Sequence, residues 1–141
     1  MRNVIYLVTS PLSKRDYDRF GIETWIERGW NVMVLDFTKF SKPDYWDHIK
    51  GDEISYNFEG LNIFSNKKDA YKSLRQLNRK TLFIDFLESN SVGRNIKNYV
   101  KKIGPVLRCC LGCYPNAKSS FVGKIKTVLS NPSIVFPYFR C

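Results

Sequence analysis

The stretch that most constrains the fold of this chain is Asn3 to Thr38, which reads as strand, loop, helix and strand. Val4 to Val8 is continuously apolar, as is typical of a strand buried on both faces of a parallel sheet. A helix is expected to begin near the capping residue Ser13 and to end at Gly29. The second apolar strand is Asn31 to Phe37. The stretch therefore predicts a βαβ unit.

The same alternation continues along the chain, less regularly around Pro43. Strands that alternate with helices of this length indicate a parallel sheet with right-handed crossovers. We therefore predict an α/β fold: a single Rossmann-like three-layer domain over residues 1–141, with a mostly parallel sheet. The further expected elements are a short turn at Asp44 to Ile49, an edge strand within Glu53 to Phe64, a helix capped by Asn66, a strand at Thr81 to Leu87, a helix capped by Ser91 and ended by Gly104, a strand at Val106 to Leu111, a helix at Ser119 to Leu129 and an apolar tail at Ser133 to Phe139.

The charge of the chain is concentrated in its second half. Residues 1–60 carry 8 Lys and Arg against 10 Asp and Glu, whereas residues 61–141 carry 15 against 3. This asymmetry favours an anionic partner, such as a phosphorylated ligand, an anionic membrane surface, nucleic acid or an acidic neighbouring domain. A solvated basic surface without a specific role is the alternative. Nucleic acid is disfavoured because the cations are spread over several helices and neither Tyr71 nor Tyr99 makes an obvious stacking platform.

No apolar run is long enough to span a bilayer, and no signal peptide is recognisable, so a cytoplasmic protein is expected. Cys110 and Cys113 form a CxxC, but no second CxxC or His pair completes a zinc site. Cys109, Cys110 and Cys113 are therefore expected to be structural or incidental thiols, with redox or metal roles left open. No metal and no cofactor is expected.

The loop after the first strand is the expected ligand site, because ligands of open α/β sheets bind at the carboxyl ends of strands. The loop contains neither GxGxxG nor GxxxxGK[ST], which excludes a standard dinucleotide-binding domain and a P-loop NTPase. Its hydroxyl groups and cations suit a phosphate or a sugar. Helix capping by Ser13 and solvation of the cations explain the same pattern. The candidate binding residues are Thr9, Ser10, Ser13, Lys14 and Arg15.

Two carboxylates lie near the carboxyl ends of predicted strands. Asp36 ends the second strand, and Asp85 interrupts the apolar strand Thr81 to Leu87. The two could converge on one cleft as a general base or as acceptors for a hydroxyl group, so both are candidate catalytic residues. A structural, hydrogen-bonded role is the alternative for each, because a carboxylate in an apolar strand needs a partner.

The run SPLSKRDYDRFGIETWIERGWNVMVLDFT from Ser10, followed by FEG at Phe58 to Gly60, resembles the amino-terminal part of glycosyltransferase-like proteins from bacterial capsule and O-antigen clusters. Those proteins look like GT-B enzymes, which place the active site between two Rossmann-like domains. The resemblance implies that this chain is the first, acceptor-side domain alone. It also implies a nucleotide-sugar donor and a glycan or lipid-linked acceptor once a second domain completes the enzyme.

Under this resemblance the chain is a fragment, a prematurely ended gene product or a domain that a separate partner completes. In each case it is incomplete for catalysis by itself, so whether it is an enzyme is left open. Its basic surface, Asn66 to Lys126, would face an anionic membrane that carries the lipid-linked acceptor, which makes the protein peripheral at the inner face. The alternative function is a non-catalytic binding module that uses the basic half for nucleic acid or an anionic surface.

Overall fold

The computed structural model describes residues 2–49, 56–78 and 80–108. Every described element lies in one compact unit, Met1–Cys109. The expected helix at Ser119 to Leu129 and the apolar tail at Ser133 to Phe139 lie outside the described residues, as do Cys109, Cys110 and Cys113. A single domain over the whole chain therefore stays a prediction.

The described elements form a five-stranded, all-parallel sheet in the order β3-β2-β1-β4-β5. This order confirms the predicted α/β, Rossmann-like fold. The chain first builds outward from β1 through β2 to β3 and then returns to the other side of β1 for β4. The gap between the carboxyl ends of β1 and β4 is therefore the topological switch point of the sheet. The strands are β1 (Asn3–Val8), β2 (Asn31–Asp36), β3 (Leu61–Ile63), β4 (Thr81–Phe86) and β5 (Val106–Arg108).

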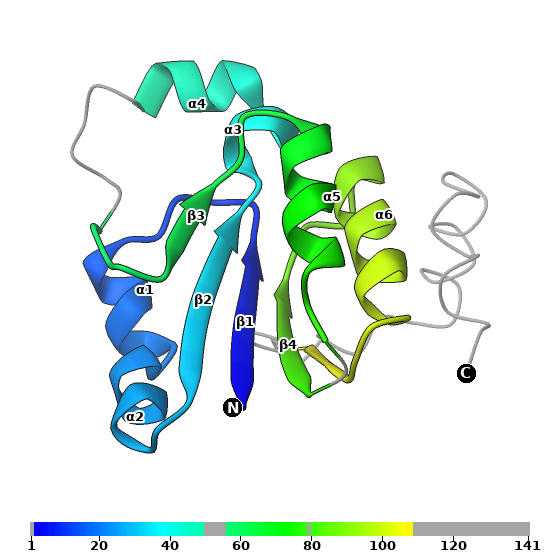
Figure 1. The fold of residues 1–141 in the computed structure, drawn as a ribbon. Helices are drawn as coiled ribbons and strands as arrows, with labels where there is room; N and C mark the ends of the chain where they lie inside the picture. The colour runs from blue at the N-terminus through cyan, green and yellow to red at the C-terminus, as the bar shows by residue number, and fades with distance from the viewer. Residues whose placement is uncertain (1, 50–55, 79, 109–141) are drawn as a thin grey trace, which may run out of the picture. The chain divides into compact units, whose positions relative to one another are not determined.

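Helices cover both faces of the sheet (Figure 1). Helices α1 (Lys14–Arg19) and α2 (Ile22–Glu27) connect β1 to β2 on one face. Helices α5 (Lys67–Arg75) and α6 (Ser91–Val100) lie next to each other on the opposite face. The short helices α3 (Thr38–Ser41) and α4 (Pro43–Ile49) follow the carboxyl end of β2.

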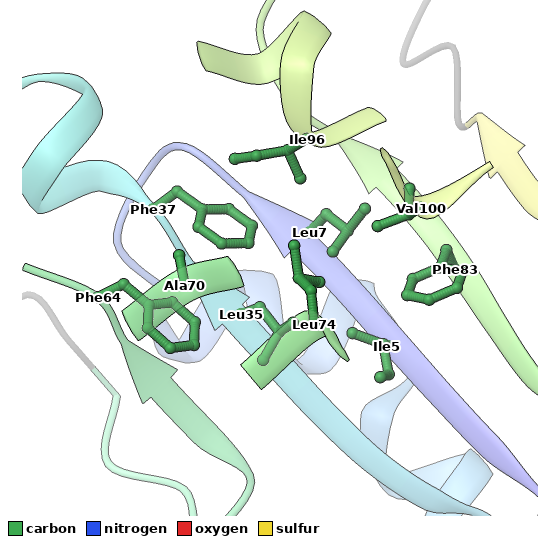
Figure 2. Packing of buried hydrophobic residues seen from close by; sticks show 10 residues of the cluster. All are labelled: Ile5, Leu7, Leu35, Phe37, Phe64, Ala70, Leu74, Phe83, Ile96 and Val100. Atoms are coloured by element: carbon green, nitrogen blue, oxygen red, sulfur yellow. The ribbon is translucent and has the colours of Figure 1, made fainter. Parts of the chain in front are cut away.

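Each face of the sheet has its own apolar core, because successive side chains of a strand point to opposite faces. Between the sheet and α5 and α6, Leu74 and Ile96 pack against strand residues such as Leu7 (Figure 2). On the face of α1 and α2, the core includes the alternate residues of β1, such as Tyr6 and Val8. The Tyr6 hydroxyl donates a hydrogen bond of 2.6 Å to the Phe20 carbonyl oxygen, which ties α1 to the sheet.

The helical segment after β1 is divided where a continuous helix was expected. Gly21 adopts a left-handed conformation with φ of +64°, which a regular helix does not allow and which glycine tolerates best. As a result α1 and α2 have six residues each. The turn expected at Asp44 to Ile49 is a complete helix, α4, because Pro43 is well suited to the first helical position.

Candidate functional site

The loops at the switch point are held together by their own polar groups. The Glu88 backbone N–H donates a hydrogen bond of 3.2 Å to Thr9 Oγ1, which joins the loops that follow β4 and β1. The Glu88 carboxylate forms an ion pair with Lys42, which lies between α3 and α4. Thr9, a candidate binding residue, is only 1% exposed. Its hydroxyl therefore has a structural use in joining the two loops.

Two of the four remaining loop candidates, Ser13 and Lys14, also have partners within α1 or next to it. Ser13 is the N-cap of α1: its hydroxyl oxygen accepts a hydrogen bond of 3.1 Å from the Asp16 N–H and donates one of 2.7 Å to Asp16 Oδ2. Lys14 Nζ lies 2.6 Å from Asp18 Oδ1, and this hydrogen bond raises the pKa of Lys14. The helix-capping interpretation thus accounts for Ser13 in full.

Ser10 and Arg15 are exposed, and Arg15 has no ion-pair partner among the described residues. Their proposed contact with a ligand stays a prediction.

Lys14, by contrast, has aromatic partners in addition to Asp18. Its Nζ lies 5.0 Å from the ring centroids of both Tyr17 and Tyr56.

Asp85 is buried and has two partners on the face that α5 and α6 cover. Its Oδ2 lies 2.6 Å from Lys97 Nζ on α6, and its Oδ1 accepts a hydrogen bond of 2.9 Å from the Leu87 N–H. The partner that a carboxylate in an apolar strand requires is therefore Lys97. This pair anchors α6 to the end of β4.

Asp36 is fully buried at the end of β2. Its Oδ1 accepts hydrogen bonds from the N–H of Thr38, at 2.7 Å, and from the Thr38 hydroxyl. Within the described residues its Oδ2 has no hydrogen-bond partner. Burial raises the pKa of this carboxyl group, and the hydrogen bonds from Thr38 oppose the rise.

The structure does not bring the two candidate catalytic carboxylates together. Asp36 pairs in register with Val8, which packs on the face of α1 and α2. Asp85 pairs with Leu7, which packs on the face of α5 and α6. The two side chains therefore belong to opposite faces of the sheet, and the expected convergence on one cleft is not found.

A concavity among the described residues lies between α5 and α6, away from the loop candidates. We call it the α5–α6 groove. Its volume is about 920 Å³. Its lining contains five cations and no carboxylate. The lining residues are Lys67, Lys68, Tyr71, Lys72 and Arg75 from α5, and Asn95, Asn98, Tyr99 and Lys102 from α6 and the turn after it.

Two tyrosines join the helices within this groove. The Tyr71 and Tyr99 rings are in contact edge to face, with centroids 5.1 Å apart and an interplanar angle of 75°. Both side chains are half-buried. Lys67 Nζ lies 5.7 Å from the Tyr71 centroid, and burial raises the pKa of the Tyr71 phenol.

The cations of the groove are not neutralised from within the two helices. The only acidic residue of α5 is Asp69, which is hydrogen-bonded to the N-cap Asn66 through its N–H at 2.9 Å and its Oδ2 at 2.7 Å. Helix α6 contains no acidic residue. The groove therefore has a concentrated positive potential that an anion can meet directly.

The sequence did not reveal this groove, because it showed the cations as spread over several helices and neither Tyr71 nor Tyr99 as an obvious stacking platform. One signal was present: Tyr71 adjoins the buried Ala70, and Tyr99 lies three residues after the buried Ile96. Both rings thus flank the apolar stripe of their helix, where a neighbouring helix of the same layer makes contact.

The comparisons with known proteins found no match to this chain among family models, curated protein sequences or solved structures. None of the helices in the described ranges is both long enough and apolar enough to cross a membrane. In those same ranges, no three His, Cys, Asp or Glu side chains gather into a metal-binding group.

Proposed function

We propose that the described domain is a binding module that holds a phosphate-bearing anionic partner in the α5–α6 groove. The observation that carries this proposal is the lining of the groove, in which five cations surround a pair of tyrosines without a carboxylate. This is the alternative function considered from the sequence, and the groove supports it more directly than any described group supports catalysis.

The arrangement of the cations has an energetic cost that a bound anion relieves. Lys68 and Lys72 are four residues apart on α5, and like charges at this spacing destabilise a helix by about 0.2–0.5 kcal/mol per pair. Lys67 and Arg75 extend the same positive surface. An anion in the groove would offset these repulsions by its attraction to the cations, and charge-assisted hydrogen bonds to phosphate oxygens are stronger than neutral ones.

The two carboxylates at the strand ends support a binding function more than a catalytic one. Asp85 is paired with Lys97, and Asp36 is buried on the other face of the sheet. The glycosyltransferase hypothesis stays a prediction supported by the sequence resemblance and by the Rossmann-like fold, which many unrelated functions share. Membrane association likewise stays a prediction.

The proposal is tested by titrating the full-length, ¹⁵N-labelled protein with inorganic tripolyphosphate at low salt and recording amide chemical shifts. The expected shifts are concentrated in Lys67 to Arg75 and Asn95 to Lys102. The double variant Lys68→Gln, Lys72→Gln should lose most of this response.

A matched control removes the same charge from the opposite face of the sheet. The double variant Arg19→Gln, Arg28→Gln changes two exposed cations in α1 and at the end of α2 and should respond like the wild type. Shifts spread evenly over the protein, or an equal loss in the control, would show non-specific attraction by net charge and contradict the proposal.

A further inference from the structure

We infer that the partner held in the α5–α6 groove is single-stranded nucleic acid. The inference rests on the proposed function and specifies its ligand. It revises the sequence-based argument against nucleic acid. That argument lacked a single surface that gathers the cations and an aromatic stacking platform, and the tertiary structure provides both. Cations from separate helices line one groove, and Tyr71 and Tyr99 come into ring contact.

The side chains that line the groove disfavour a bilayer as the partner. Proteins that bind an anionic membrane surface combine cations with apolar side chains that enter the interface. The large apolar side chains exposed in the described residues are Ile26, Tyr45, Ile63 and Leu107, and none of them lines the groove. The groove is instead an open concavity that is lined by cations and by half-buried rings.

The dimensions of the groove fit a short stretch of one strand. Lys68 and Arg75 are seven residues apart on α5, which corresponds to about 10 Å at 1.5 Å per residue. At about 3.4 Å per nucleotide along a stacked strand, this length covers roughly three phosphates. Lys102 provides a cation on the α6 side of the groove.

The groove contains groups that contact bases as well as phosphates. Aromatic rings provide stacking surfaces for unpaired bases irrespective of sequence. Tyr71 and Tyr99 lie within the groove, and the amides of Asn95 and Asn98 line it beside them and can hydrogen-bond to base edges. A duplex keeps its bases stacked inside, so recessed rings favour a single strand over a double helix.

The inference is tested by fluorescence anisotropy of the full chain with a 5′-fluorescein-labelled dT dodecamer. Three to four phosphate contacts predict a slope of about −2 to −3 in a plot of log K against log salt concentration. Lys68→Gln, Lys72→Gln should make this slope less negative by about 1.4, whereas Arg19→Gln, Arg28→Gln should leave it unchanged.

The tyrosines give the readout that distinguishes a nucleic acid from any polyanion. Tyr71→Leu should weaken dodecamer binding by about 5- to 150-fold, the range expected for one stacked base, and should leave the tripolyphosphate response intact. Tyr71→Phe keeps the ring and should bind within about twofold of the wild type. Circular dichroism of each variant checks that it folds.

Three results would overturn the inference. The first is dodecamer binding that Tyr71→Leu does not weaken. The second is no dodecamer binding by a protein that responds to tripolyphosphate, which leaves the proposed function standing. The third is binding to vesicles of one part phosphatidylglycerol to three parts phosphatidylcholine without binding to the dodecamer, which identifies a bilayer instead. If neither tripolyphosphate nor the dodecamer binds, the proposed function fails as well.

Discussion

The ion pair between Asp85 and Lys97 can be tested by removing the cation. Lys97→Met keeps an unbranched side chain that ends one atom short of the Lys97 ammonium nitrogen, and it leaves the Asp85 carboxylate, whose side chain is 1% exposed, without its counter-charge. If Asp85 has a structural role, this substitution should lower the free energy of unfolding by far more than a surface substitution does.

The magnitude follows from the burial of the two partners. Removing one partner of a fully buried ion pair costs about 3–5 kcal/mol. Lys97 retains 23% exposure, and Asp85 keeps the hydrogen bond from the Leu87 N–H, so water and a backbone dipole offset part of this cost. We expect a loss of about 2–3 kcal/mol, which corresponds to roughly 10–20 °C in Tm for a domain of about 100 residues.

The assay is urea unfolding followed by far-ultraviolet circular dichroism, with Lys101→Met as an exposed control on the same helical segment. In the double variant Lys97→Met, Asp85→Asn the uncompensated charge is gone, so it should be at least 1 kcal/mol more stable than Lys97→Met alone. A loss below 1 kcal/mol in Lys97→Met, or no rescue by Asp85→Asn, would refute the structural assignment and return Asp85 to the catalytic candidates.

Three further predictions address the remaining groups at the strand ends and the start of α6. Burial raises the pKa of Asp36 above 3.8, so the stability that this group contributes is complete below pH 3.8 and is lost as the pH rises through the pKa of the folded state. Across that pH range Asp36→Asn should therefore gain stability relative to the wild type, which a series of urea unfolding experiments at different pH values measures. Gly93→Ala should destabilise the protein by about 1–3 kcal/mol despite the better helix propensity of alanine, because its Cβ would lie 2.1 Å from the Glu88 carbonyl oxygen; thermal unfolding measures the loss, and an unchanged Tm would contradict it. Thr9→Val removes the acceptor of the Glu88 N–H and should cost about 1–2 kcal/mol, with faster hydrogen exchange at that amide; unchanged exchange would show that the bond does not hold the loops together.

The fold class could be predicted because its signals are local. Val4 to Val8 is a continuous apolar run, and Thr81 to Leu87 is an apolar run interrupted by Asp85. The strands β1 and β4 form there because strands buried in a parallel sheet accept apolar side chains on both faces. Asn66 and Ser13 cap helices as predicted, since a side-chain oxygen satisfies the free N–H groups of the first turn wherever the helix lies.

The helix boundaries were less predictable. Gly21 interrupts the pattern between Tyr17 and Trp25, but apolar spacing does not reveal whether a glycine is tolerated within a helix or adopts a left-handed conformation. The N-cap of α6 is Asn90, whose Oδ1 accepts a hydrogen bond of 2.8 Å from the Gly93 N–H, and not the expected Ser91. Both residue types cap helices well, so only the backbone geometry decides between them.

The sequence by itself determined which residues form strands, which helices are basic and where Asp36 and Asp85 fall along their strands. Only the tertiary structure decided which other residues they contact. The strand order places α5 and α6 side by side on one face, which gathers the cations of α5 with Lys102 and brings Tyr71 against Tyr99. The pairing register of β2 and β4 with β1 places the Asp36 and Asp85 side chains on opposite faces of the sheet. The physical reason is that helix and strand signals act over a few residues, whereas proximity between elements is set by crossovers and packing of the whole sheet.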